Sequence, residues 1–183
     1  SDDPLHVNDL EPALVSTAHY EKGDLFISSR NLSCILQFRP STNQVIRLLE
    51  GPFYSQHDVD FYGDSSIVLF NNNGHTISQK NMNAHPKSID ILDAGTFNSN
   101  VVGYDFKRDA YFSVYDSTFK QNKIYSFTES LQEMMDDGSM FVEEQNRGFL
   151  WVIKNDEVIY KNVLKSQHEG YHHLPNWTRI INN

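Results

Sequence analysis

The chain has 183 residues, of which 39% are hydrophobic and 21% charged, and its formal net charge is −9 at pH 7. This length suits one domain with a sizeable core, and the composition is that of a globular protein. The acidic balance and the lack of a Lys/Arg cluster argue against a phosphate-backbone partner, so nucleic acid is not expected.

Membrane and disulfide chemistry are not expected either. No apolar run approaches the roughly 20 residues that a helix needs to span a bilayer. The N-terminal residues 1–4 lack a signal-peptide pattern, which favours a soluble segment that is processed or trimmed. The single cysteine, Cys34, excludes an internal disulfide and a multi-thiolate metal site. Because it opens the apolar run 34–38, we expect an inert thiol in a buried strand.

Three stretches of the chain repeat one order of strands and turns. Each begins with a strand and a polar turn containing Gly and Asp, continues with a second strand that ends in Asn, and adds two further short strands. The predicted strands, in chain order, are 6–14, 25–31, 34–38 and 45–49, then 57–62, 67–72, 101–106 and 110–115, then 131–135, 140–146, 149–153 and 157–162.

This repeat predicts an all-β fold of the propeller type. Asn31, Asn72 and Asn146 fall at equivalent places, and four-stranded units of about 40–50 residues are typical of propeller blades. We therefore expect one partial β-propeller domain over residues 1–183. Its expected parts are blades at 5–50, 56–116 and 128–163 and a closing strand at 172–181. A small β-sandwich is the alternative fold.

Three blades and one strand cannot close a ring, because propellers need at least four blades. Either a longer parent chain supplies the missing blades, or a second copy does so in a homodimer. The second blade also carries an insertion, from about Asn73 to Asn100, that is rich in Asn, Ser, Lys and His. We expect a long surface loop there, with His75 and His85 in solvent.

The stretch from Gly51 to Phe61 contains the most distinctive polar pattern. His57 stands where a Gly-Pro turn ends and an alternating strand begins. Alternation predicts that Asp58 and Asp60 lie on the opposite face of the strand from His57. First strands of blades face the central channel, so polar residues at the other blade starts should converge with His57. These residues are His6, Asn8, Glu129, Glu133, His172, His173 and Arg179.

Several classes of function are compatible with polar residues at the blade starts. A channel wall is wet, so its polar residues need no chemistry, and the chain could be a non-catalytic propeller that binds a ligand or a protein partner. A metal-dependent hydrolase or lyase could use His6, His57 and channel carboxylates. A phosphate-binding loop and a Gly-x-Ser-x-Gly motif are both missing from the sequence, so we expect neither a nucleotide cofactor nor serine hydrolysis.

Two further sets of residues have structural interpretations. Tyr104, Phe106, Phe112 and Tyr115 lie in outer strands, and we expect them to pack between blades. The pair 143–144, two glutamates, ends a second strand, where either one could reach the channel mouth or both could lie at a solvated strand end.

Six short motifs occur in order along the chain. They are Leu-His-Val-Asn-Asp at 5–9, Ser-Ser-Arg-Asn at 28–31, Ser-Gln-His-Asp at 55–58, Thr-Glu-Ser-Leu-Gln-Glu at 128–133, Phe-Val-Glu-Glu-Gln-Asn at 141–146 and Asn-Trp-Thr-Arg at 176–179. This ordered set resembles the bacterial arylsulfotransferase family and its uncharacterised propeller relatives. The resemblance implies a six-bladed propeller of which this chain supplies the C-terminal half, and a periplasmic or secreted location.

The resemblance also implies a set of catalytic residues. In that family the nucleophile is a histidine after a glutamine, which matches His57. A His-x-Asn pair matches His6 and Asn8, and the arginine of a Ser-Ser-Arg strand matches Arg30. The implied reaction moves a sulfuryl group from a small aromatic sulfate ester to a phenol through a sulfohistidine, without an adenosine-based sulfate donor or another cofactor.

The implied set is chemically coherent. A neutral imidazole can attack sulfur, which divides one difficult displacement into two easier ones. Arg30 can offer a planar fork of donors to two sulfuryl oxygens, and Asn8 can add its amide. His6, if protonated, could give a proton to the departing phenolate.

Overall fold

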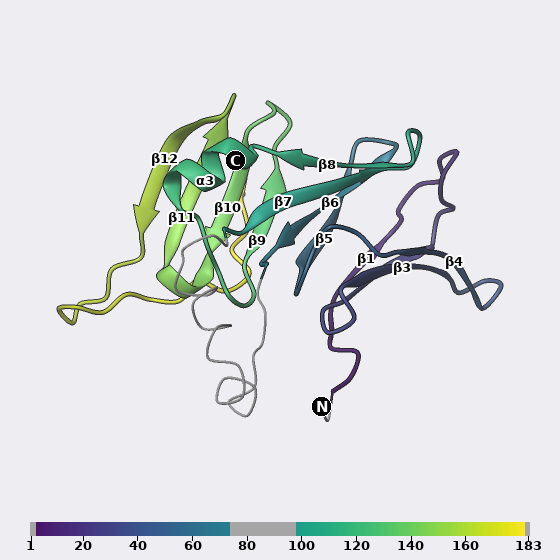
Figure 1. Cartoon of the computed structure of the whole chain (residues 1–183), viewed down its shortest axis with the longest axis horizontal. Coiled ribbons are helices and arrows are strands. Elements are labelled where there is room, and N and C mark those ends of the chain that lie inside the picture. The colour runs from purple at the N-terminus through teal and green to yellow at the C-terminus, as the bar shows by residue number, and fades with distance from the viewer. Residues whose placement is uncertain (1–2, 74–97, 182–183) are drawn as a thin grey trace, which may run out of the picture.

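The computed structural model describes residues 3–73 and 98–181. Its strands form three four-stranded antiparallel sheets, each in chain order (Figure 1). The first sheet contains β1 (Val7–Pro12), β2 (Leu25–Ser29), β3 (Cys34–Arg39) and β4 (Gln44–Leu49). The second contains β5 (His57–Tyr62), β6 (Ser66–Asn71), β7 (Asn100–Asp105) and β8 (Ala110–Val114). The third contains β9 (Leu131–Met134), β10 (Met140–Glu144), β11 (Phe149–Lys154) and β12 (Glu157–Val163).

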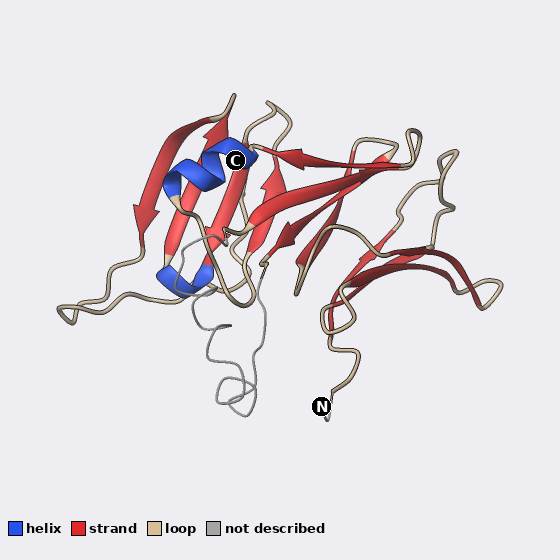
Figure 2. Cartoon of the chain, viewed as in Figure 1, coloured by secondary structure: helices blue, strands red, loops and turns tan. Residues whose placement is uncertain are grey.

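These sheets confirm the prediction of an all-β chain built from three four-stranded units. The helical residues described are α3 (Asp116–Asn122), which follows β8, and the 3₁₀ turn η1 (Gln145–Arg147), which follows β10 (Figure 2). Gly63 and Gly138 have φ of 63° and 79° in the turns after β5 and β9, a conformation that glycine adopts without strain. The Gly-containing turns of the sequence therefore end the first strands of the second and third sheets.

The second sheet packs between the other two. One buried cluster, which includes Phe26, Ile35, Leu69 and Tyr104, joins the first sheet to the second. Another, which includes Val68, Phe70, Met140, Val142 and Trp151, joins the second sheet to the third. The aromatic residues expected between units lie here: Tyr104 and Phe106 in the first cluster, Phe112 and Tyr115 against the second. Cys34 is also buried, as expected.

The first strands of the three sheets lie next to one another, since β5 contacts both β1 and β9. Each is an edge strand, and a carboxylate bridges each junction. Asp9 Oδ2 accepts a hydrogen bond of 2.6 Å from the backbone N–H of Val59, and Asp58 Oδ2 accepts one of 2.7 Å from that of Gln132. These carboxylates satisfy edge N–H groups and align each first strand with its neighbour.

The segment 172–181 differs from the expected closing strand. Its one β contact is an isolated bridge between Lys165 and His172, and no strand forms in the rest of it. The backbone N–H of Thr178 donates to Glu143 Oε2 (2.8 Å) instead of to a neighbouring strand, and Pro175 has no N–H to donate. The segment therefore lies against β10 as an irregular chain.

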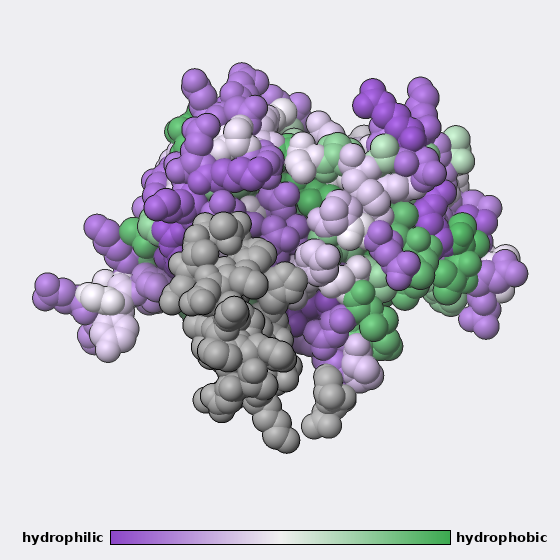
Figure 3. All heavy atoms as spheres, viewed as in Figure 1, coloured by the Kyte–Doolittle hydropathy of each residue, from purple (hydrophilic) through white to green (hydrophobic). Residues whose placement is uncertain are grey.

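Most of the predicted insertion at 73–100, with His75 and His85, lies outside the described residues. No helix in the described ranges is long and apolar enough to cross a membrane. On the surface, hydrophobic side chains gather over the first sheet (Figure 3). Those exposed there include Val7, Leu10, Val45, Ile46 and Leu48.

The packing between the first two sheets predicts a strong dependence on Phe26, which is fully buried. Phe26→Ala should lower the free energy of unfolding by about 3–5 kcal/mol, because the removed ring leaves a cavity. Tyr62→Ala, at a side chain that is 43% exposed, is the matched control and should change stability little. Urea denaturation measures both, and equal effects of the two substitutions would contradict this account of the core.

Candidate functional site

Asn8, Arg30 and His57 come together at the junction of the first and second sheets. Asn8 Nδ2 donates a hydrogen bond of 2.7 Å to the carbonyl oxygen of Gln56, the residue before His57. Arg30 follows β2, whose last residue, Ser29, pairs with Val7 of β1. The Arg30 charge acts on the His57 ring and contributes to lowering its pKa. The three predicted residues are therefore neighbours at one end of β1, β2 and β5.

His57 is buried, with 4% of its surface exposed. Its Nδ1 lies 3.1 Å from the carbonyl oxygen of Ser55 and 2.8 Å from Asn72 Oδ1. A carbonyl oxygen only accepts, so Nδ1 carries the hydrogen and a neutral ring keeps its lone pair on Nε2. Within the described residues Nε2 has no hydrogen-bond partner. The lone pair of this nitrogen is therefore not used by a hydrogen bond within the described residues.

The surroundings of His57 favour its neutral form. Burial lowers the pKa of the His57 imidazole, the hydrogen bond with Asn72 partly opposes that effect, and the Arg30 charge lowers the pKa further. An imidazole whose pKa lies below its ordinary value is mostly unprotonated at neutral pH. His57 thus meets the first requirement of a nitrogen nucleophile.

His6 precedes β1 and is joined to Arg30 through the backbone, and among the described residues no hydrogen bond or ion pair links it to His57. Its carbonyl oxygen accepts the backbone N–H of Arg30 (3.0 Å), whereas its ring Nδ1 lies 2.7 Å from Asp3 Oδ2. The side chain is 43% exposed. Arg30 Nη1 donates to Asn31 Oδ1 at 3.0 Å. The backbone thus joins His6 to Arg30, and the ring of His6 pairs with a carboxylate.

The regular period of two predicted for the start of β5 is interrupted at Asp58. The pairing of β5 with β6 shifts register between His57 and Val59, and Asp58 adopts φ of 57°. Asp58 is thus the extra residue of a β-bulge, which interrupts the period of two. It still faces the third sheet together with Asp60, because Gln132 donates its backbone N–H to Asp58 and its Nε2 to Asp60 (3.0 Å).

Burial reduces the negative charge that these two acids carry. It raises the pKa of Asp58 well above its ordinary value, and the neighbouring Asp60 raises it further. Burial and then the charge of Glu11 raise the pKa of Asp60 to about 7. Near neutral pH the pair therefore repels an anion less than two ionised carboxylates would.

A cleft of about 390 Å³ lies farther along β5 and β9. Its lining includes Glu11, Asp60, Glu133 and Arg179, so three carboxylates face one guanidinium. Among residues 3–73 and 98–181, no group of three His, Cys, Asp or Glu could hold a metal ion. The acidic lining disfavours an anionic ligand in this cleft.

Sequence reasoning assigned no role to Gln56, which stands in the Gln-His motif. Its side chain is fully buried, and Nε2 lies within hydrogen-bond distance of Ser28 Oγ (3.2 Å), Ser29 O (3.1 Å) and Cys34 O (3.2 Å). The glutamine therefore fastens the start of β5 to the end of the first sheet. Its signal in the sequence was its place directly before His57.

Asn72 was also missed, although the repeat of asparagines after second strands contained it. Asn31 and Asn146 bond the segments that lead into β1 and β9. In the second sheet Asn71 has that task, since its Oδ1 accepts the backbone N–H of Tyr54 (2.8 Å). The asparagines at equivalent contacts are therefore 31, 71 and 146, and Asn72 is free to bond His57.

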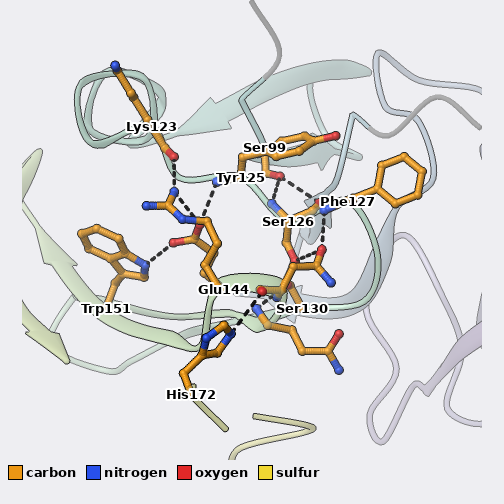
Figure 4. A network of polar contacts seen from close by, with 12 residues as sticks. Ser99, Lys123, Tyr125, Ser126, Phe127, Ser130, Glu144, Trp151 and His172 are labelled. Carbon is orange, nitrogen blue, oxygen red and sulfur yellow. Dashed lines mark hydrogen bonds and ion pairs between the residues drawn. The ribbon is translucent and has the colours of Figure 1, made fainter. Parts of the chain in front are cut away.

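A buried polar network connects Asn72 to the third sheet. Asn72 Nδ2 donates to the carbonyl oxygens of Ser126 (2.9 Å) and Glu129 (2.7 Å). Ser126 in turn donates its N–H to Ser99 Oγ (3.0 Å) and its hydroxyl to Asn146 Oδ1 (2.9 Å) (Figure 4). The segment leading into β9 is thereby held between β6 and β10.

Glu143 and Glu144 are buried, at 1% and 0% exposure, so a solvated strand end is not what the structure shows. Glu144 lies inside this network, where Trp151 Nε1 donates to it (3.0 Å) and Arg147 Nη1 forms an ion pair with it (2.9 Å) (Figure 4). These donors replace water around the carboxylate, although burial still raises the pKa of Glu144.

The family model described as Arylsulfotransferase (ASST) matches residues 1–162. The match covers most of the 183 residues, so the chain belongs to the arylsulfotransferase (ASST) family. Searches of the curated proteins and of the solved structures returned no significant match. This match confirms the family that the six motifs predicted.

The raised pKa of Asp60 predicts how stability depends on pH. Because the folded state favours the protonated acid, the free energy of unfolding should fall as pH rises from 3.8 to about 7. Asp60→Asn keeps an acceptor for Gln132 but cannot ionise, so it should flatten this slope. Chemical denaturation at several pH values tests the prediction, and an unchanged slope in the variant would contradict it.

Proposed function

We propose that the three sheets are blades of a propeller and that the protein transfers a sulfuryl group from an aromatic sulfate ester to a phenol through His57. The adjacent first strands support the propeller arrangement. So does the exposed first sheet, where Leu10, Ile27, Leu36 and Leu48 form an apolar row across all four strands. Another blade, from a longer chain or a second copy, would bury this row.

The observation that carries the proposed chemistry is the state of His57. The ring is buried, its Nδ1–H is bonded, and its Nε2 has no partner in the described part of the chain. Membership of the arylsulfotransferase family supports an aromatic sulfate ester as the substrate class. The site thus combines an unprotonated nucleophile with a neighbouring guanidinium.

In the first step Nε2 attacks the sulfur of the ester and forms an N–S bond. The bond from sulfur to the aryl oxygen breaks, and its electron pair leaves with the phenolate. Arg30 holds two of the sulfuryl oxygens through charge-assisted hydrogen bonds. We assign His6, whose carbonyl oxygen accepts the backbone N–H of Arg30, to donate a proton from its ring to the departing oxygen.

In the second step the oxygen of the acceptor phenol attacks sulfur, and the N–S bond breaks. Its electron pair returns to Nε2, and the phenol proton passes to a base or to water. Asn8 holds the backbone before His57 in place through Gln56, and we assign its other amide hydrogen to a sulfuryl oxygen. The buried ring regains its neutral form and can begin another cycle.

His57→Ala should abolish transfer from 4-nitrophenyl sulfate to a phenol, because no other group in the proposed site replaces the nucleophile. Release of 4-nitrophenol, followed by absorbance, measures the reaction. His168→Ala, at an exposed ring, is the matched control and should keep full activity. Full activity in His57→Ala would contradict the role of His57 as nucleophile. A folded and complete ring without activity would contradict the transferase proposal and favour a propeller that binds a ligand or a protein partner.

Arg30→Ala should lower kcat/KM about tenfold to a hundredfold, since charged hydrogen bonds contribute about 1.5–3 kcal/mol. Removing the Arg30 charge should also raise the pKa of His57, which moves the acidic limb of the pH profile to higher pH. Arg108→Ala, at a side chain that is 82% exposed, serves as the control. An unchanged kcat/KM in Arg30→Ala would contradict the proposal that Arg30 binds the sulfuryl group.

A further inference from the structure

We propose that Asn72 is the positioning residue that holds His57 in the Nδ1–H tautomer and so presents the lone pair of Nε2 to the sulfuryl group. This role rests on the proposed function for the identity of the electrophile. The tautomer itself follows from hydrogen bonding and can be tested without a substrate.

The donors of Asn72 fix the direction of its amide. Asn72 is fully buried, and its Nδ2 lies 2.9 Å from Ser126 O and 2.7 Å from Glu129 O. Both partners are carbonyl oxygens, so both amide hydrogens are in use and Oδ1 must be the atom that faces His57. A flipped amide would place Oδ1 against two acceptors and leave them without donors, which is costly in a buried site.

The partners of Asn72 are themselves held in place. Ser99 Oγ is within hydrogen-bond distance of Asn72 O (3.2 Å) and Ser126 O (3.3 Å), and Ser126 is further bonded to Asn146. Figure 4 shows Ser99 and Ser126 within this network. The acceptor that faces Nδ1 is therefore fixed by contacts from the residue before β7, from the segment before β9 and from η1.

That the Asn72 side chain carries no charge matters as much as the orientation of its amide. An aspartate at this position would pair with the imidazolium form and raise the pKa of His57. An asparagine accepts Nδ1–H without adding a charge, so the lowering of the pKa by burial is retained. The other charged groups that act on the ring are Arg30 and Glu129, and neither changes in the variants below.

The direct test is NMR of the His57 ring nitrogens in ¹⁵N-histidine-labelled protein, compared with Asn72→Asp and Asn72→Ala. In the parent protein the hydrogen should be on Nδ1 and absent from Nε2. Asn72→Asp should raise the pKa of His57 by about one unit or more, by the effect of an adjacent opposite charge. Asn72→Ala leaves the carbonyl oxygen of Ser55, 3.1 Å from Nδ1, as the remaining acceptor, so it should weaken the preference for the Nδ1–H tautomer without reversing it, and lower kcat about tenfold with a smaller change in KM.

Asn71→Asp is the matched control. Asn71 is also buried, but its side chain bonds Tyr54, Asn73 and Asn100, and in the described part of the chain no hydrogen bond joins it to His57. This variant should leave the tautomer of His57 unchanged and raise its pKa less than Asn72→Asp does, because the new charge is not bonded to Nδ1, even if it loses as much stability as the Asn72 variants. It thereby separates positioning of the ring from a general loss of structure.

A hydrogen on Nε2 in the parent protein would overturn the proposal, and so would an Asn72→Asp variant with an unchanged His57 pKa. These outcomes are independent of activity. If the tautomer and its dependence on Asn72 are found but no sulfuryl transfer occurs, the proposed function fails and the role of Asn72 in holding the ring stands.

Discussion

The hydrogen bond between His57 Nδ1 and Asn72 Oδ1 links the fold of this protein to its proposed chemistry. The bond is 2.8 Å long and joins the first residue of β5 to the residue after β6, at the end of the middle sheet. His57 Nδ1 must be the donor of this bond, since both amide hydrogens of Asn72 are donated to carbonyl oxygens. The orientation of one ring therefore depends on a segment that lies more than fifty residues farther along the chain.

The contacts between first strands provide the frame for that bond. Asp9 and Asp58 each accept an edge N–H from the next sheet, and Gln56 inserts its amide into the end of the first sheet. Carboxylates in such a position are costly when ionised, which explains why burial raises the pKa of Asp9 and Asp58. The same acids that align the sheets thus carry less negative charge close to His57.

Local pattern was enough to predict most of the fold. Gly-containing turns and short apolar runs gave the twelve strands and their grouping in fours, because hairpin pairing is decided by neighbours in sequence. The closing strand at 172–181 failed, because strand formation needs a partner that sequence does not identify. The bulge at Asp58 also escaped prediction, since a single extra residue leaves no mark on an alternating pattern.

Of the predicted site residues, Asn8 bonds the residue before His57 and the Arg30 charge acts on the His57 ring, whereas the ring of His6 pairs with Asp3. The role of Asn72 could not be read from the sequence. The repeat pointed to that position, but only the contacts distinguish it from Asn71, which holds the segment before β5. Buried polar networks such as the one around Glu144 combine residues from several elements, so no local sequence pattern predicts them.

The most direct test of the central claim is a search for the covalent intermediate. The protein is mixed with 4-nitrophenyl sulfate in the absence of an acceptor, and its mass and peptides are analysed. The account predicts one added sulfuryl group per active site, located on His57 and lost when a phenol is supplied. Transfer to phenol without any adduct, or an adduct on another residue, would contradict it.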